Sequence, residues 1–186
     1  FLKHIGNVQP GQKVLINGAS GSLGTAAVQL AKHFGAEVTA VSSTRNVGLV
    51  KSLGADHVID YTKQDFTKST ERYDLIFDTV GKSSYGACKG ILTEKGQFLS
   101  PVLQFGLLID MLRTSRSKGK KAVFAATGMR KESELREMLI ELIEIFKEGK
   151  ITTVIDRQFP LEKLAEAHRY VDAGRKKGNV VINVQS

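Results

Sequence analysis

The chain has 186 residues, 41% hydrophobic and 25% charged, and a formal net charge of +8 at pH 7. These values are ordinary for a globular protein and allow one full domain with an appendage. The basic residues are spread along the chain without a nucleic-acid-binding motif, so we expect no nucleic-acid partner. No apolar run is long enough to span a bilayer, so we expect no membrane partner. The single cysteine, Cys88, favours a reducing compartment, and we expect a cytoplasmic location.

The first strong pattern is a glycine-rich turn between two predicted elements. Residues 14–16 (VLI) are typical of a buried strand, and residues 22–34 have the apolar spacing of an amphipathic helix. A turn of this kind brings backbone N–H groups and a helix N-terminus to a phosphate. Ala19 stands where such turns often begin with glycine, so we expect Gly18 to adopt the positive φ. The residues expected at the phosphates are Ser20, Gly21, Ser22, Leu23 and Gly24; the alternative is a tight turn without a ligand.

A second predicted strand, residues 37–42, ends at the sequence SSTRN. In dinucleotide-binding folds, an acidic residue at this point binds the ribose 2′-hydroxyl of NAD, whereas an arginine accommodates the 2′-phosphate of NADP. This stretch has no carboxylate, and Ser43 and Arg45 offer a donor and a positive charge. We therefore predict a preference for NADP. Alternatively, Ser43 and Thr44 cap the next helix and Arg45 is solvated.

Several longer motifs carry a family resemblance. They are GQKVLINGASG (residues 11–21), LGADHVIDY (53–61), YDLIFDTVG (73–81), AEAHRY (165–170) and GNVVI (178–182). With them, the sequence resembles the medium-chain dehydrogenase/reductase superfamily, in its branch of quinone oxidoreductases and zinc-type alcohol dehydrogenase-like proteins. The resemblance implies an NAD(P)-binding Rossmann domain at residues 1–150. Residues 151–186 then form a C-terminal segment of a catalytic domain whose larger part is absent from this sequence.

The remaining chain alternates strands and helices, which predicts an α/β, doubly wound parallel sheet of six strands with a short α+β tail. The later strands are expected at residues 57–61, 73–78, 96–100 and 121–125, and helices at 47–53 and 84–92. Residues 105–112 are expected to form an apolar helix or loop. Because ligands bind at the carboxyl ends of such strands, we expect Thr79, Val80, Gly81 and Ser100 to border the cofactor. The family resemblance adds Tyr61, at the adenine and 2′-phosphate end; a half-buried strand-end aromatic is the alternative.

The two ends of the chain and its later helices complete these expectations. Residues 1–5 are predicted to end a helix. A helix up to Gly149 is predicted to bury one stripe, formed by Leu135, Met138, Leu139, Leu142, Ile143 and Phe146. The tail is predicted to be extended at residues 151–159, helical from Pro160 and a strand at 179–184, with His168 in its core. In the family, the sixth strand pairs across a two-fold axis, which implies a homodimer.

These observations together predict the NADP-binding portion of an oxidoreductase that transfers hydride between NADPH and a quinone, a carbonyl or an activated alkene, a small-molecule substrate. No catalytic residue can be named, and scattered histidines with one cysteine predict no metal site. Without the rest of a catalytic domain, we expect the chain to bind cofactor without turnover. The alternatives are a non-enzymatic NADP-binding sensor and a methyltransferase-like domain that binds S-adenosylmethionine.

Overall fold

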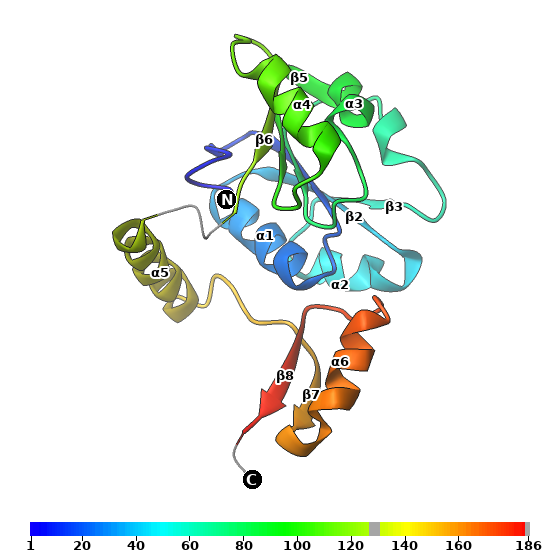
Figure 1. Ribbon diagram of the computed structural model, residues 1–186, viewed down its shortest axis with the longest axis vertical. Coiled ribbons are helices and arrows are strands. Elements are labelled where there is room, and N and C mark those ends of the chain that lie inside the picture. Colours follow the sequence, from blue (N-terminus) through cyan, green and yellow to red (C-terminus); the bar gives the residue numbers. More distant parts are fainter. Residues whose placement is uncertain (127–130, 185–186) are drawn as a thin grey trace.

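The computed structural model describes residues 1–126 and 131–184, and its largest unit is a six-stranded sheet (Figure 1). The strand order is β3-β2-β1-β4-β5-β6, and all neighbouring pairs are parallel. The strands are β1 (Lys13–Asn17), β2 (Glu37–Ser42), β3 (His57–Asp60), β4 (Tyr73–Asp78), β5 (Leu92–Ser100) and β6 (Lys121–Phe124). The expected doubly wound parallel sheet of six strands is confirmed, and its fifth strand begins four residues earlier than predicted.

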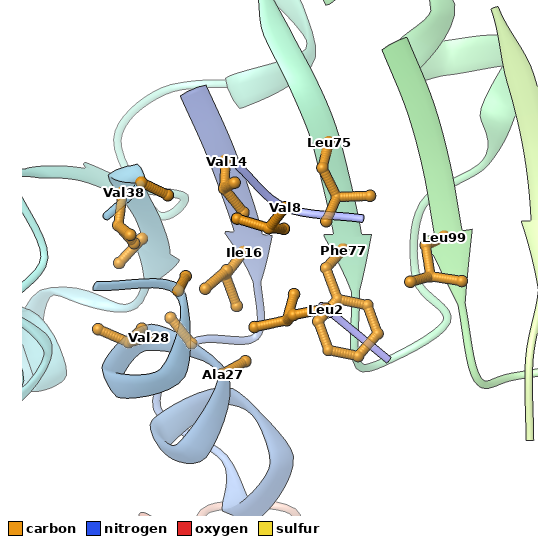
Figure 2. Packing of buried hydrophobic residues seen from close by; sticks show 14 of the residues in the cluster. Leu2, Val8, Val14, Ile16, Ala27, Val28, Val38, Leu75, Phe77 and Leu99 are labelled. Atoms are coloured by element: carbon orange, nitrogen blue, oxygen red, sulfur yellow. The ribbon is translucent and has the colours of Figure 1, made fainter. Parts of the chain in front are cut away.

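The sheet is covered on both faces, which explains why its central strands β1 and β4 each contain an uninterrupted apolar run, at residues 14–16 and 75–77. Side chains alternate across a strand: Val14 and Ile16 of β1 pack in one core, with α1 (Ser22–His33), and Leu15 packs in the other, with Cys88. Figure 2 shows the first core, where Phe77 of β4 lies beside Ile16. These rigid central strands fix the edge at which their carboxyl ends meet.

The turn between β1 and α1 has the glycine geometry that the sequence predicts. Gly18 has a φ of +78°, so it supplies the left-handed residue where Ala19 would be strained. A Cβ on Gly24 would lie 2.1 Å from the Gly18 carbonyl oxygen, so only glycine lets the helix approach the turn this closely. Gly21 is the N-cap of α1 and leaves the helix N-terminus without a side-chain cap.

Three shorter helices follow along the sheet: α2 (Val47–Ser52), α3 (Tyr85–Cys88) and α4 (Phe105–Thr114). The predicted helix at 84–92 is thus much shorter, because it tightens into a 3-10 turn at Lys89–Ile91 before β5 begins. Residues 1–5 form a single turn in which the Ile5 N–H donates to the Phe1 carbonyl oxygen at 3.0 Å, the hydrogen-bond spacing of a helix end, and Leu2 packs in the first core.

The last two helices bury less than the sequence predicts. In α5 (Glu132–Lys147), Ile145 alone is buried, so the expected six-residue core stripe is wrong. Its exposed apolar side chains include Leu139, Leu142, Ile143 and Phe146. In α6 (Leu164–Asp172), Ala167 is buried and His168 is exposed, so the core histidine is also wrong. The apolar periodicity marks real helical faces, but among the described residues these faces stay largely exposed.

The C-terminal unit lies at the bottom of the view in Figure 1, below α1 and α2. It consists of β7 (Ile155–Pro160), α6 and β8 (Asn179–Asn183), with the two strands parallel. Gly178, just before β8, forms a bridge with Gly21 and donates its N–H to the Ser20 carbonyl oxygen at 2.8 Å. The tail is therefore attached directly to the glycine turn. In the described part of the chain, no helix is long and apolar enough to cross a bilayer.

Candidate functional site

A cavity of about 350 Å³ opens at the carboxyl ends of β1 and β2, beside the N-terminus of α1. It lies where ligands of open α/β sheets bind, outside the carboxyl ends of the strands. Residues from the sheet unit and from the tail line it: Asn17, Gly18, Ser20, Gly21, Val41, Ser42, Ser43, Arg45, Asn46, Tyr61, Phe66, Val80, Lys82, Gly174 and Lys176. Six of the twelve site residues predicted from the sequence belong to this set: Ser20, Gly21, Ser43, Arg45, Tyr61 and Val80.

The charged residues of the cavity all have the same sign. Arg45, Lys82 and Lys176 line it, and none of its described lining residues is an aspartate or a glutamate. The partial positive charge of the α1 N-terminus adds to these three cations. Such a wall favours a ligand that carries several negative charges, and phosphate groups are the common biological form of such charge.

Asn46 anchors the turn after β2 and leaves one polar atom unmatched. Its Nδ2 donates to Ser20 Oγ at 2.9 Å and to Ser43 Oγ at 3.3 Å, which connects the two predicted phosphate-binding segments. The side chain is 4% exposed, yet its Oδ1 accepts no hydrogen bond from the described residues. A buried amide oxygen without a donor is costly, so a hydrogen-bond donor from a ligand or a water would stabilise this wall.

Arg45 and Tyr61 stand at the outer part of the cavity. Arg45 is exposed, and its guanidinium donates to the Arg175 carbonyl oxygen at 3.2 Å. A single long bond of this kind leaves most of its five donors available. Tyr61 directly follows β3 and is exposed, so it can offer a ring face to a ligand rather than the half-buried packing that was the alternative.

Asp78 organises the end of β4 and has a structural role. This buried carboxylate accepts hydrogen bonds from the Asn17 side chain at 3.0 Å and from the backbone N–H of Val80, Gly81 and Ser83. Four donors use its lone pairs, as expected for a carboxylate that holds a loop in place. The loop carrying Val80 is therefore fixed at the cavity edge.

The other six predicted residues lie near the cavity without lining it. Ser22 starts α1 and bonds to the tail, Leu23 is half-buried beside the first core, and Gly24 packs beneath the turn. Thr79 donates to the Asn17 carbonyl oxygen, Gly81 has a φ of +66°, and the buried Ser100 donates to the Asp78 carbonyl oxygen. These residues shape the turns around the cavity.

Sequence reasoning missed several lining residues, above all Asn46, Lys82 and Lys176. Asn46 directly follows the predicted Arg45, so extending that segment by one residue would have found it. The position of Lys176 depends on how the tail packs against the glycine turn, about 150 residues earlier in the chain, and no local pattern gives that contact.

We also searched for metal-binding side chains and for a reactive thiol. In residues 1–126 and 131–184, no three His, Cys, Asp or Glu side chains are grouped so that they could hold a metal ion. Cys88 is buried, and burial raises the pKa of its thiol to about 11. A thiol with such a pKa is a poor nucleophile near neutral pH.

Comparison with known proteins defines the family. The family model described as zinc-binding dehydrogenase matches residues 53–182, which is most of the chain. This chain belongs to the zinc-binding dehydrogenase family. This family assignment agrees with the sequence motifs, which resemble those of the medium-chain dehydrogenase/reductase superfamily. The metal in the family name has no match among the described side chains of this member, so we derive no zinc-dependent step for it.

The relatives of this chain include proteins named as oxidoreductases and reductases. It is 36% identical to the mitochondrial NAD(P)H oxidoreductase RTN4IP1 of Mus musculus over 94% of this chain and 48% of that protein. It is 34% identical to the 2-methylene-furan-3-one reductase of Solanum lycopersicum, over 93% of this chain and 40% of that protein. The quinone oxidoreductase of Coxiella burnetii has the same fold, with a TM-score of 0.84 and 28% identity over 98% of this chain and 56% of that chain. The chain thus spans about half the length of these relatives.

Proposed function

We propose that this chain is the NADP-binding portion of an oxidoreductase that transfers hydride between NADPH and a quinone, a carbonyl or an activated alkene. The observation that carries the proposal is the cavity at the α1 N-terminus, lined by three cations and by no described carboxylate. Family membership supports an oxidoreductase, and the small-molecule substrates named for the relatives support the reaction class. In this proposal, residues 1–150 form the nucleotide-binding domain; residues 151–186, of which 185–186 lie outside the described part, belong to the catalytic domain.

The cavity wall fits a dinucleotide. The glycine turn leaves the α1 N-terminus open to the pyrophosphate, and Gly18 has no room for a side chain, because a Cβ there would lie 2.6 Å from Thr79 Oγ1. The unmatched Asn46 Oδ1 sits beside the turn after β2, where a ribose hydroxyl could donate to it. Arg45 and Ser43 would bind the 2′-phosphate, and Tyr61 would lie against the adenine. Bound NADPH would supply the hydride; the protein binds and orients it.

The alternatives have less support. A methyltransferase-like site would need an acidic residue for the ribose hydroxyls at the end of β2, and the described lining residues there are Ser42, Ser43, Arg45 and Asn46. A non-enzymatic NADP sensor would share the cavity but would lack turnover in the full-length protein. That protein's activity on quinones and enones therefore separates the sensor from the enzyme.

We also propose a homodimer through the sheet edge. β6 is the last strand of the sheet order, and it pairs with β5 on one side only among the described strands. An open edge of this kind invites a second strand. Light scattering on concentrated protein should give twice the chain mass; a monomer would contradict the dimer. A cytoplasmic location remains a proposal, since the RTN4IP1 relative is mitochondrial.

The variant Arg45→Ala tests the cofactor assignment. Hydrogen bonds to a charged group contribute about 1.5–3 kcal/mol, so we expect NADPH binding to weaken roughly ten- to a hundredfold in calorimetric titration. NADH lacks the 2′-phosphate, and its affinity should be nearly unchanged. Equal losses for both cofactors would contradict the role of Arg45.

A further inference from the structure

The carboxylate of Asp60 lies at the carboxyl end of β3 and contacts the loop that follows β2, the neighbouring strand. Its Oδ2 accepts a hydrogen bond from Thr44 Oγ1. Its Oδ1 accepts two hydrogen bonds from Thr62, from the backbone N–H at 3.0 Å and from Oγ1 at 2.7 Å. These bonds, the one from Thr44 first, lower the pKa of the Asp60 carboxyl. Asp60 is therefore an ionised side chain that joins the segments after two neighbouring strands.

Thr44 is the middle residue of the segment that we propose to bind the 2′-phosphate. It separates Ser43 from Arg45 and begins a 3-10 turn. Ser43 is the N-cap of this turn but makes no side-chain capping hydrogen bond, whereas the Thr44 hydroxyl donates to Asp60. Asn46 ties this segment to the glycine turn, and Asp60 ties it to β3. The place of the segment thus depends on a side chain from another strand.

Asp60 itself is not one of the described residues that line the cavity. It is half-buried, and three donors from the protein already occupy its two oxygens. A carboxylate that faced the cavity would repel a phosphate. The next residue, Tyr61, does line the cavity, and its N–H donates to the Ser42 carbonyl oxygen at 3.1 Å. The contact between Asp60 and Thr44 therefore acts on the residues of the cavity wall and leaves the wall itself cationic.

We propose that Asp60 is a positioning residue that sets the preference for NADPH over NADH, because it holds Ser43 and Arg45 in place through Thr44. This inference rests on the proposed function. A loop already held in its binding conformation loses less conformational freedom when the 2′-phosphate binds, so the affinity for that group rises. NADH has no 2′-phosphate and gains nothing from the same order. Asp60 thus acts on the choice of cofactor without touching the cofactor.

The test is the ratio of NADPH affinity to NADH affinity, measured by calorimetric titration of the chain and its variants. Asp60→Ala and Thr44→Val each remove the contact, and we expect each to lower the ratio about three- to tenfold. The double variant should lower the ratio no further than the stronger single variant, because both residues act through one contact.

Asp65→Ala is the matched control. Asp65 Oδ1 accepts the same two hydrogen bonds from Thr67, at 3.0 Å and 2.7 Å, as Asp60 Oδ1 accepts from Thr62, but these bonds stay within one loop. We expect Asp65→Ala to change the ratio by less than about twofold.

Asp60→Asn separates positioning from charge. Asparagine keeps an oxygen for Thr62 and gains an amide N–H that can donate to Thr44 Oγ1, so the contact can persist without the carboxylate. We expect Asp60→Asn to retain at least about half of the ratio, where Asp60→Ala loses most of it. This rescue by a similar side chain is a result that general destabilisation of the fold would not produce.

Three results would overturn the inference alone. They are a ratio that rises in Asp60→Ala, which would mean that the carboxylate only repels the phosphate; a loss of NADH affinity with NADPH unchanged, which would mean that Asp60 binds the ribose; and an unchanged ratio in Thr44→Val. The Thr44→Val result also decides the question if Asp60→Ala does not fold. If the unmodified chain binds NADPH no better than NADH, the proposed cofactor assignment fails, and this inference fails with it.

Discussion

The sheet unit and the C-terminal unit are built from similar elements but bury very different amounts of apolar surface. In the sheet, β1 buries Val14, Leu15 and Ile16 completely, because helices cover both faces. In β7, α6 and β8, which are described throughout, Phe159 and Ala167 are the buried hydrophobic residues. The sheet can be stable through its own core, whereas the C-terminal unit depends on contacts at its edge.

The two units contribute different parts of the cavity wall. The sheet supplies the rigid parts, which are the glycine turn, the Asp78 loop and the Asn46 network. The C-terminal unit supplies Lys176, and Gly178 attaches this unit to the glycine turn by its hydrogen bond to the Ser20 carbonyl oxygen. Since weakly buried segments open with small free energies, the tail should open before the sheet does, and a ligand that contacts both units should reduce this opening.

The largest contrast is expected between two phenylalanines. Phe77 is 1% exposed in the sheet core, and Phe77→Ala should lower the free energy of unfolding by about 3–5 kcal/mol. Phe105 at the start of α4 is 80% exposed, and Phe105→Ala should change it by less than about 0.5 kcal/mol. Denaturant unfolding measures both. Similar losses would mean that the exposed face of α4 is covered in solution.

Thiol labelling compares the two units directly. Cys88 is buried in the sheet core with a pKa raised to about 11, so labelling near neutral pH should be at least about a hundredfold slower than for a free thiol. Its rate should rise about tenfold per pH unit, as the thiolate fraction does. Ala165→Cys places an exposed thiol in α6, which should react at the rate of a free thiol. Rapid labelling of Cys88 would show that the sheet opens easily.

Two glycine-to-alanine variants test the packing of the turn against α1, with smaller expected changes in stability. A Cβ at Gly24 would meet the Gly18 carbonyl oxygen, so Gly24→Ala should cost about 1–3 kcal/mol of stability and weaken NADPH binding. Gly48 in α2 has no atom within 4 Å of such a Cβ, so Gly48→Ala should stabilise by about 0.5–1 kcal/mol. Thermal unfolding measures both the loss of stability in Gly24→Ala and the gain in Gly48→Ala. Stabilisation by Gly24→Ala would contradict the close approach of turn and helix.

The sequence predicts the sheet well, because its strands are short apolar runs between glycine turns. The role of Gly18 could be predicted from one residue, since Ala19 cannot take the left-handed conformation. The predictions for the stripe of α5 and for His168 were wrong, because helical periodicity shows which side chains share a face but not whether anything packs on it.

The same limit applies to the site. Ser20, Gly21, Ser43 and Arg45 could be predicted because each follows a strand whose carboxyl end must face the cavity. Lys176 could not, because its place depends on a contact between the tail and the glycine turn. Local patterns therefore predicted the rigid half of the cavity and missed the part that the tail adds.

We also predict whether this chain alone turns over substrate. The chain spans about half the length of its relatives, and the described residues offer no metal cluster and no activated thiol. We expect NADPH to bind and to remain unoxidised when a panel of quinones and enones is added, because within residues 1–126 and 131–184 we identify no side chains that would position the acceptor. Absorbance of the reduced nicotinamide follows the reaction. Rapid oxidation would show that the sheet unit holds catalytic groups not identified in the cavity.

We expect the cationic cavity to bind NADPH through its phosphates. This is measured by calorimetric titration of the unmodified chain with NADPH, NADH and S-adenosylmethionine under matched conditions. We expect tight NADPH binding at one site per chain, NADH binding weaker by about ten- to a hundredfold, and no measurable S-adenosylmethionine binding. Equal affinity for NADPH and NADH would contradict the 2′-phosphate pocket at Ser43 and Arg45, and binding of S-adenosylmethionine alone would contradict the dinucleotide site.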